Sequence, residues 1–187
     1  MNATPLIMVF LLCGLLGAVS AKAERAGDFE IAVQPINKES SQRIGGDGYW
    51  TEKEKSQTLV YKVKLTYKGL EKLENILIKY LVAYTAQGSS QQGSQGRNYG
   101  RSSVQTIKGD EKVDKLSTLD NVEFTTKMIE NVYQESTWHG GKSQHGKAQM
   151  KGIALKIMQG DKVLVEWAKP AETKEYWTRE DDSSRQK

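Results

Sequence analysis

Two histidines, His139 and His145, are the side chains of this 187-residue sequence that are suited to metal binding or to general-base catalysis. No acidic residue or cysteine lies between them to complete a site of three or four ligands. We therefore expect two incidental histidines in a solvated loop and no metal site.

Other enzyme signatures are incomplete. The segment Gly140–Ser143 has the Gly-Gly-Lys-Ser order that ends a phosphate-binding loop, but that motif requires a glycine at position 136, which is Ser136. No serine has the G-x-S-x-G spacing of a hydrolase nucleophile. Four carboxylates could form the acid pair of a glycosidase, yet they lie among lysines, as a solvated charged loop would; they are Asp110, Glu111, Asp114 and Asp120. We expect no catalytic activity and no cofactor.

Aromatic side chains beside glycine-rich or polar segments offer binding chemistry instead, because such rings stack on sugars or anchor protein partners. The segment from Gln87 to Ser103, with 13 Gly, Ser or Gln among 17 residues, is expected to be a long connecting loop or, alternatively, a binding loop. The ordinary alternative for Trp50 and Trp138 is that they cap the open ends of the fold. The candidate binding residues are Tyr49, Trp50, Arg97, Tyr99, Arg101 and Trp138.

The N-terminus has the pattern of a secretory signal peptide. An eleven-residue apolar run, Leu6–Leu16, precedes the triplet Ala21-Lys22-Ala23, so we expect residues 1–23 to be removed. Two alternatives are disfavoured. A retained anchor would be too short, because eleven helical residues rise only about 16 Å. A lipidated Cys13 would follow Leu12, where lipoprotein signals have a small side chain.

Removal of this segment also removes the one cysteine, so the exported chain is expected to be free of disulfides. The destination is then the periplasm, the outer surface or the extracellular space, with no integral membrane span after cleavage.

The charge balance of the chain argues against a nucleic-acid partner. The chain has 27 Lys+Arg against 23 Asp+Glu and a formal net charge of +4, which is too mixed for a nucleic-acid-binding surface.

Period-two patterns predict strands to position the candidate residues. Apolar and polar side chains alternate in Leu59–Tyr67, and shorter alternations occur in Phe29–Val33 and Val122–Met128. Ile76–Tyr84 is apolar on nearly every position, which predicts a central strand covered on both faces. Ile153–Ile157 and Val163–Trp167 form a predicted β-hairpin around the turn Gln159-Gly160-Asp161-Lys162, with Trp167 in the core.

Helical and irregular segments are few. Ile36–Arg43 is too polar to hold a helix, whereas Ala171–Arg179 could form a short amphipathic turn after Pro170. His139–Lys147 is expected to be a polar loop. We predict an all-β, antiparallel immunoglobulin-like sandwich of about seven strands over residues 24–170, with a charged C-terminal tail over residues 171–187.

Two strings resemble a known family. The segment LTYKGLEKLENILIKYLVAY is similar to the second and third strands of bacterial secreted Ig-like sandwiches, and GIALKIMQGDKVLVEWAKP is similar to their closing hairpin. Proteins of this kind occur in mucin-dwelling gut bacteria of the verrucomicrobial group, including surface proteins associated with type IV pilus-like systems. The resemblance covers about half of the mature chain and implies fold more directly than activity.

Two functions follow as expectations. The first is a secreted, non-enzymatic structural or interaction protein that contacts other surface or pilus-like proteins, or further copies of itself, through sheet edges, loops or hydrophobic contact. The alternative is a carbohydrate-binding module for mucin glycans that uses the loop aromatics.

Overall fold

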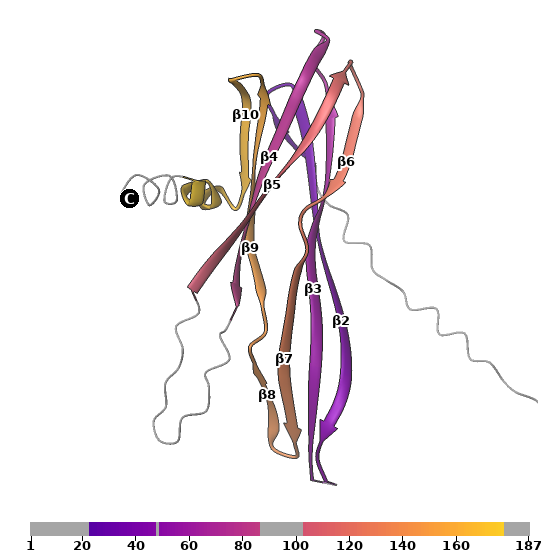
Figure 1. Ribbon diagram of the computed structural model, residues 1–187, viewed down its shortest axis with the longest axis vertical. Helices are drawn as coiled ribbons and strands as arrows, with labels where there is room; N and C mark the ends of the chain where they lie inside the picture. Colours follow the sequence, from indigo (N-terminus) through magenta and orange to yellow (C-terminus); the bar gives the residue numbers. More distant parts are fainter. Residues whose placement is uncertain (1–22, 48, 87–102, 178–187) are drawn as a thin grey trace, which may run out of the picture.

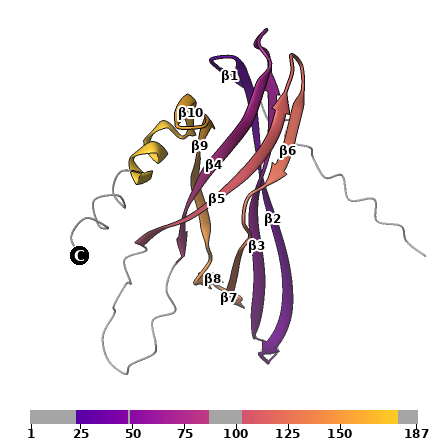
Figure 2. The same ribbon diagram turned by 45° about the horizontal axis from the view of Figure 1, so that its top comes forward.

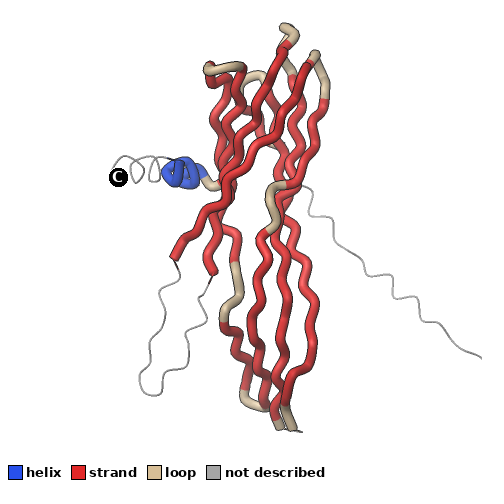
Figure 3. Tube along the Cα trace, viewed as in Figure 1, coloured by secondary structure: helices blue, strands red, loops and turns tan. Residues whose placement is uncertain are grey.

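The computed structural model describes residues 23–47, 49–86 and 103–177. These residues form two antiparallel sheets, and strands dominate the trace (Figures 1 and 3). The first sheet contains β1 (Glu24–Ala26), β2 (Phe29–Gly45), β3 (Trp50–Tyr67), β6 (Asn121–Thr125), β7 (Ile129–Trp138) and β8 (Gly141–His145). The second sheet contains β4 (Leu73–Ala86), β5 (Ser103–Leu116), β9 (Gln149–Gln159) and β10 (Lys162–Lys169). The predicted all-β antiparallel sandwich is confirmed.

The second sheet has the order β10-β9-β4-β5. The order is similar to that of one sheet of immunoglobulin variable domains, in which the last two strands of the domain, F and G, lie beside the central strand C. β4 pairs with β5 on one side and with β9 on the other, which confirms the predicted central strand. The predicted hairpin is confirmed too, because Lys162 pairs with Gln159 at the turn and Trp167 with Leu155.

In the first sheet, β3 is long enough to have different neighbours at its two ends. Its first half pairs with β7, and its second half pairs with β6. Between them, Thr126 completes the ladder: the amide of Tyr61 donates to Thr126 Oγ1, and the Thr126 amide donates to the Tyr61 carbonyl, both at 3.0 Å. The side chain of Thr126 thus satisfies a buried amide that a break between two strands would leave unpaired.

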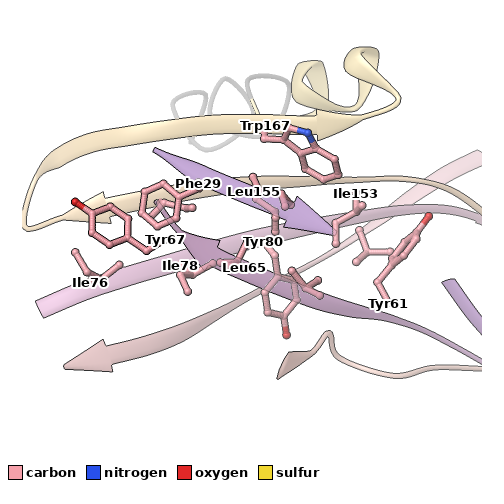
Figure 4. Packing of buried hydrophobic residues seen from close by; sticks show 14 of the residues in the cluster. Phe29, Tyr61, Leu65, Tyr67, Ile76, Ile78, Tyr80, Ile153, Leu155 and Trp167 are labelled. Carbon is pink, nitrogen blue, oxygen red and sulfur yellow. The ribbon is translucent and has the colours of Figure 1, made fainter. Parts of the chain in front are cut away.

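The hydrophobic core lies between the two sheets (Figure 4). Alternate residues of β3 from Leu59 to Tyr67 face alternate residues of β4 and β9, because successive side chains of a strand point to opposite faces. Trp167 is buried in this cluster as predicted, and its indole nitrogen donates to Glu24 at 3.2 Å.

The C-terminal segment covers part of the outer face of the second sheet. A 3-10 helix, η1 (Ala171–Lys174), follows Pro170 and leads into a helical turn that ends at Trp177 (Figure 2). A side chain at Gly152 would overlap Thr173, which is buried. Leu81 and Ala83, which lie on this face of β4, are fully buried.

Ile36–Arg43 forms no helix, as expected, and is part of β2. Two segments differ from the expectation: the expected loop His139–Lys147 contains β8, and the acids Asp110, Glu111 and Asp114 lie in strand β5 instead of a loop. The structure has ten strands among its described residues instead of about seven. The additional strands are polar on both faces or lie at a sheet edge, so no apolar alternation marks them.

The additional strand length forms an arm. We use this name for residues 37–45 of β2, 50–57 of β3 and 131–138 of β7, together with β8. The arm extends beyond the core of the sandwich, at the bottom of Figure 1. Residues 1–22 of the expected signal peptide and residues 178–187 of the expected tail lie outside the described residues.

Candidate interaction site

The far end of the arm brings together two turns that are distant in sequence. Trp50 begins β3, Trp138 ends β7, and the two are register partners in the antiparallel ladder. Directly opposed residues of neighbouring antiparallel strands have their side chains on the same face. The two indoles therefore lie on the same face of the arm tip, although 88 positions separate the two residues in the sequence.

Local hydrogen bonds fix the turn before Trp50. The Asp47 carboxylate accepts from the amide of Tyr49 at 2.9 Å and from that of Trp50 at 3.3 Å. Gly46 has φ of +117°, and a side chain there would collide with the Trp50 carbonyl, so glycine is required at this position.

The rings at the tip are accessible to a partner. Tyr49 is 78% exposed, Trp50 42% and Trp138 46%. The Tyr49 ring meets the ring of His139, in the β7–β8 turn, edge to face at a centroid distance of 6.2 Å. Ile44, near the end of β2 and beside the same turn in the sequence, is also exposed. We call these five residues the aromatic tip.

Three of the six predicted binding residues thus lie together: Tyr49, Trp50 and Trp138. Neither tryptophan belongs to the hydrophobic cluster of the sandwich. The other three, Arg97, Tyr99 and Arg101, lie outside the described residues.

A buried ion-pair cluster stiffens the arm that holds this tip. The Glu135 carboxylate, in β7, is only 4% exposed. It accepts from Lys55 at 2.9 Å, from Lys142 at 2.7 Å and from Gln144 at 2.7 Å. Burial alone would raise the pKa of Glu135, but these hydrogen bonds and the lysine charges outweigh burial and lower the pKa to about 2. Glu135 therefore ties β3, β7 and β8 together as a carboxylate.

A second ion-pair cluster joins β2 to β7 on the inward face of the arm. Glu39 accepts from Lys147 at 2.9 Å and from the Tyr133 hydroxyl at 3.1 Å. The hydrogen bond from Lys147 is the main reason that the pKa of Glu39 is lowered. Lys55 and Lys147 lie 6.0 and 5.5 Å from the centroid of the Tyr133 ring, in cation–π contact with it.

Gln57 links the arm to the strand that returns to the sandwich. Its side chain is 1% exposed, donates to the Ala148 carbonyl at 3.2 Å and accepts from the Ala148 amide at 3.1 Å. Because both the donor and the acceptor of this buried amide are satisfied by Ala148, the two hydrogen bonds hold β3 to the segment before β9 in one defined geometry. Sequence reasoning missed Gln57 and both ion-pair clusters. The available signal was the odd-numbered set Thr51, Lys53, Lys55 and Gln57, which continues the inward period of Leu59–Tyr67 with polar residues.

Three lysines in or directly after the sandwich half of β3 pair with carboxylates and so form no free cationic surface. Lys62 and Lys64 both pair with Glu123, at 3.1 and 3.5 Å, and Lys68 pairs with Glu30 at 3.2 Å. A shallow depression beside them is lined by residues of both charge signs, among them Glu30, Lys64 and Lys68. These exposed pairs are ordinary surface electrostatics.

Neither a metal site nor a membrane helix is found in the described ranges. No group of three or more His, Cys, Asp or Glu residues there is arranged to hold a metal ion. Within the same ranges, no helix has the length and apolar character needed to cross a membrane.

Comparisons with known proteins give little beyond this geometry. No protein-family model matches the sequence, and no curated protein matches it significantly. Among solved structures, the chain is similar to the X-ray structure of the Northeast Structural Genomics Consortium target SoR45, with 10% sequence identity over 63% of this chain and 84% of that chain. The TM-score is 0.18, so this likeness carries no conclusion about fold or function.

Proposed function

We propose that the chain is an exported, non-enzymatic interaction protein that binds a partner protein through its aromatic tip. The observation that carries this proposal is the meeting of Tyr49, Trp50 and Trp138, all exposed, at the end of an arm. Tryptophan and tyrosine are the residue types most enriched among the energetic centres of protein interfaces. Three such rings from two separate turns differ from the scattered exposed apolar residues of an ordinary surface.

The position of the tip supports a contact with another protein. It is the end of a sheet that projects from the core, and the depression described above lies on the sandwich half of the molecule. Small ligands are usually enclosed in concave sites, whereas a protruding aromatic patch fits a large partner surface. Export rests on the signal-like residues 1–23. A cell-surface or pilus-like setting rests on the family resemblance of the strands and hairpin alone.

Glycan binding is the second candidate. The two indoles share one face of the sheet, and exposed flat rings of this kind can stack on the apolar face of a sugar. His139 and Tyr49 would supply polar groups beside them.

The experiment is cross-linking of the tagged protein in its native cells, followed by mass spectrometry of the captured proteins. It compares the wild type with the double variant Trp50→Ala/Trp138→Ala. Val132→Ala is the matched control, because Val132 is 60% exposed on β7 but lies away from the tip. We expect the double variant to lose its captured partner at least tenfold and the control to retain it.

Glycan binding is measured on the same proteins with mucin-type glycans immobilised on a solid support. Retention that disappears in the double variant, with no protein partner captured by the wild type, would replace the first proposal by the second. A double variant that keeps both properties would exclude the aromatic tip from either role.

A further inference from the structure

One side of β2 is open along most of its length. β3 pairs with β2 from Phe29 to Gly45, but β1 covers the opposite side only from Phe29 to Ile31. From Ala32 onward, no backbone group of the described residues pairs with this side (Figure 1). A strand edge of this length is a template for pairing with another strand.

The hydrogen bonds of β3 show which β2 groups point outward. Tyr61, the register partner of Pro35, exchanges its bonds with Thr126, on the side of β3 away from β2. Pro35 and every second residue of β2 therefore direct their backbone groups away from β3. Pro35 has no N–H to offer, so the usable edge begins at Asn37 and continues through Glu39, Ser41 and Arg43.

The side chains of this edge complement themselves when two copies run antiparallel. We propose that β2 pairs with β2 of a second copy of this chain, with the two-fold axis at Ser40. The residues with outward-facing backbone groups then lie directly opposite one another, Asn37 opposite Arg43 and Glu39 opposite Ser41. The two-fold axis repeats each pair, and each pair exchanges two bonds, which gives about eight backbone hydrogen bonds in all. On the other face, the opposed residues are Ser40 with Ser40 and Lys38 with Gln42, and Ile36 comes opposite Ile44, which lies in the β-bulge between Arg43 and Gly45.

Neighbouring registers are less favourable. An axis at Glu39 opposes two glutamates and brings Pro35 into the ladder, and an axis at Lys38 opposes two lysines. An axis at Ser41 places Lys38 against Ile44 and leaves Ile36 without an apolar neighbour. Like charges directly opposite each other destabilise a strand pair, whereas apolar pairs stabilise it. The axis at Ser40 avoids each of these conflicts.

β5, an edge strand of the other sheet, differs from β2 in composition. It has six charged residues among its fourteen, which is typical of an edge protected against pairing. Pairing through β2 joins two arms into one continuous sheet and directs the two aromatic tips to opposite ends. The dimer would present two binding tips, although the pairing itself does not depend on the function of the tip.

Cysteine cross-linking tests the register. In a Cys13→Ser background, Ser40→Cys places two thiols at a directly opposed pair that makes no backbone hydrogen bonds of its own, where Cα atoms lie about 4.5 Å apart, within disulfide range. Gln42→Cys is the matched control, because the two copies of residue 42 would lie about 13 Å apart along the strands. We expect mild oxidation to convert most of the Ser40→Cys chain to a disulfide dimer, at a rate at least tenfold above that of the control.

Light scattering after size exclusion tests the dimer itself, on the full chain as the expressing cell processes it. The wild type should elute as a dimer. Ser41→Pro removes an outward N–H without touching the bonds to β3, so it should elute as a monomer with an unchanged circular dichroism spectrum. A wild type that stays monomeric at millimolar concentration, or equal cross-linking by Ser40→Cys and Gln42→Cys, would overturn the proposal even if Ser41→Pro fails to fold.

Discussion

Substitution of Glu135 by glutamine should destabilise the protein at neutral pH and not at low pH. Glutamine keeps the shape and a hydrogen-bonding oxygen but removes the charge that Lys55 and Lys142 face. A pKa lowered from its ordinary 4.5 to about 2 corresponds to about 3.4 kcal/mol of stabilisation, at 1.36 kcal/mol for each pKa unit. The Lys142 side chain is 49% exposed, so solvent screens part of this interaction, and we expect a loss of about 1–2 kcal/mol.

The pH dependence follows from the direction of the pKa change. The pKa is lower in the folded than in the unfolded chain, so the stabilisation is complete above about pH 4.5. It is lost as the pH falls from 4.5 through the folded-state pKa of about 2, below which the carboxylate is protonated in both states. The difference between the wild type and Glu135→Gln should therefore shrink over this interval and vanish below about pH 2.

Urea unfolding followed by far-UV circular dichroism at pH 7, 5, 4 and 3 measures this difference. Glu123→Gln is the control, since Glu123 also contacts two lysines but is exposed, and its removal should change the free energy of unfolding little. An unchanged stability of Glu135→Gln at pH 7, or a loss that persists undiminished at pH 3, would refute the assignment of Glu135 as a charged anchor of the arm.

Three further substitutions test the sandwich and its attachments. Leu65→Ala, in the core and 1% exposed, should cost about 2–5 kcal/mol in the free energy of unfolding, measured by urea denaturation. Gln57→Ala leaves the Ala148 amide and carbonyl unpaired and should cost about 1–3 kcal/mol in the same assay; an unchanged midpoint would contradict the buried anchor. Gly152→Ala forces its new methyl group against Thr173, so limited proteolysis should cleave near η1 faster than in the wild type, and equal rates would argue against the close packing there.

The sequence predicted the strands of the sandwich where apolar burial, on one face or on both, determines the residue pattern. Leu59–Tyr67 alternates because one face meets the core and the other meets water, and the structure places these residues accordingly. Ile76–Tyr84 is apolar on both faces because the other sheet covers one side and η1 packs on the other. In both segments, the pattern of apolar residues follows the faces that are buried: alternate positions in the first and nearly all positions in the second.

The arm could not be predicted in the same way. Its inward face consists of Glu39, Lys55, Gln57, Glu135 and similar residues, so inward and outward positions are both polar and the period-two contrast disappears. Several of the stabilising pairs join residues 80 or more positions apart, such as Lys55 with Glu135, and a single sequence does not indicate which charges meet. For the same reason Tyr49, Trp50 and Trp138 could be chosen as exposed aromatics but not as neighbours.

The change from apolar to polar along one strand explains how a single sheet can project from the sandwich. Within the sandwich, the inward face of β3 from Leu59 to Tyr67 and Ile129 at the start of β7 pack in the hydrophobic cluster between the sheets. Burial of their apolar area stabilises this part of the sheet. Beyond these residues the hydrophobic cluster ends, so an apolar inward face there would be a liability in water, and paired charges with Gln57 take its place. Apart from Val132 and Tyr133 of β7, the apolar side chains of the arm are those at its tip. Trp50 and Trp138 are exposed and lie outside the hydrophobic cluster, so the proposed contact with a partner would give them a role that the core of the sandwich does not.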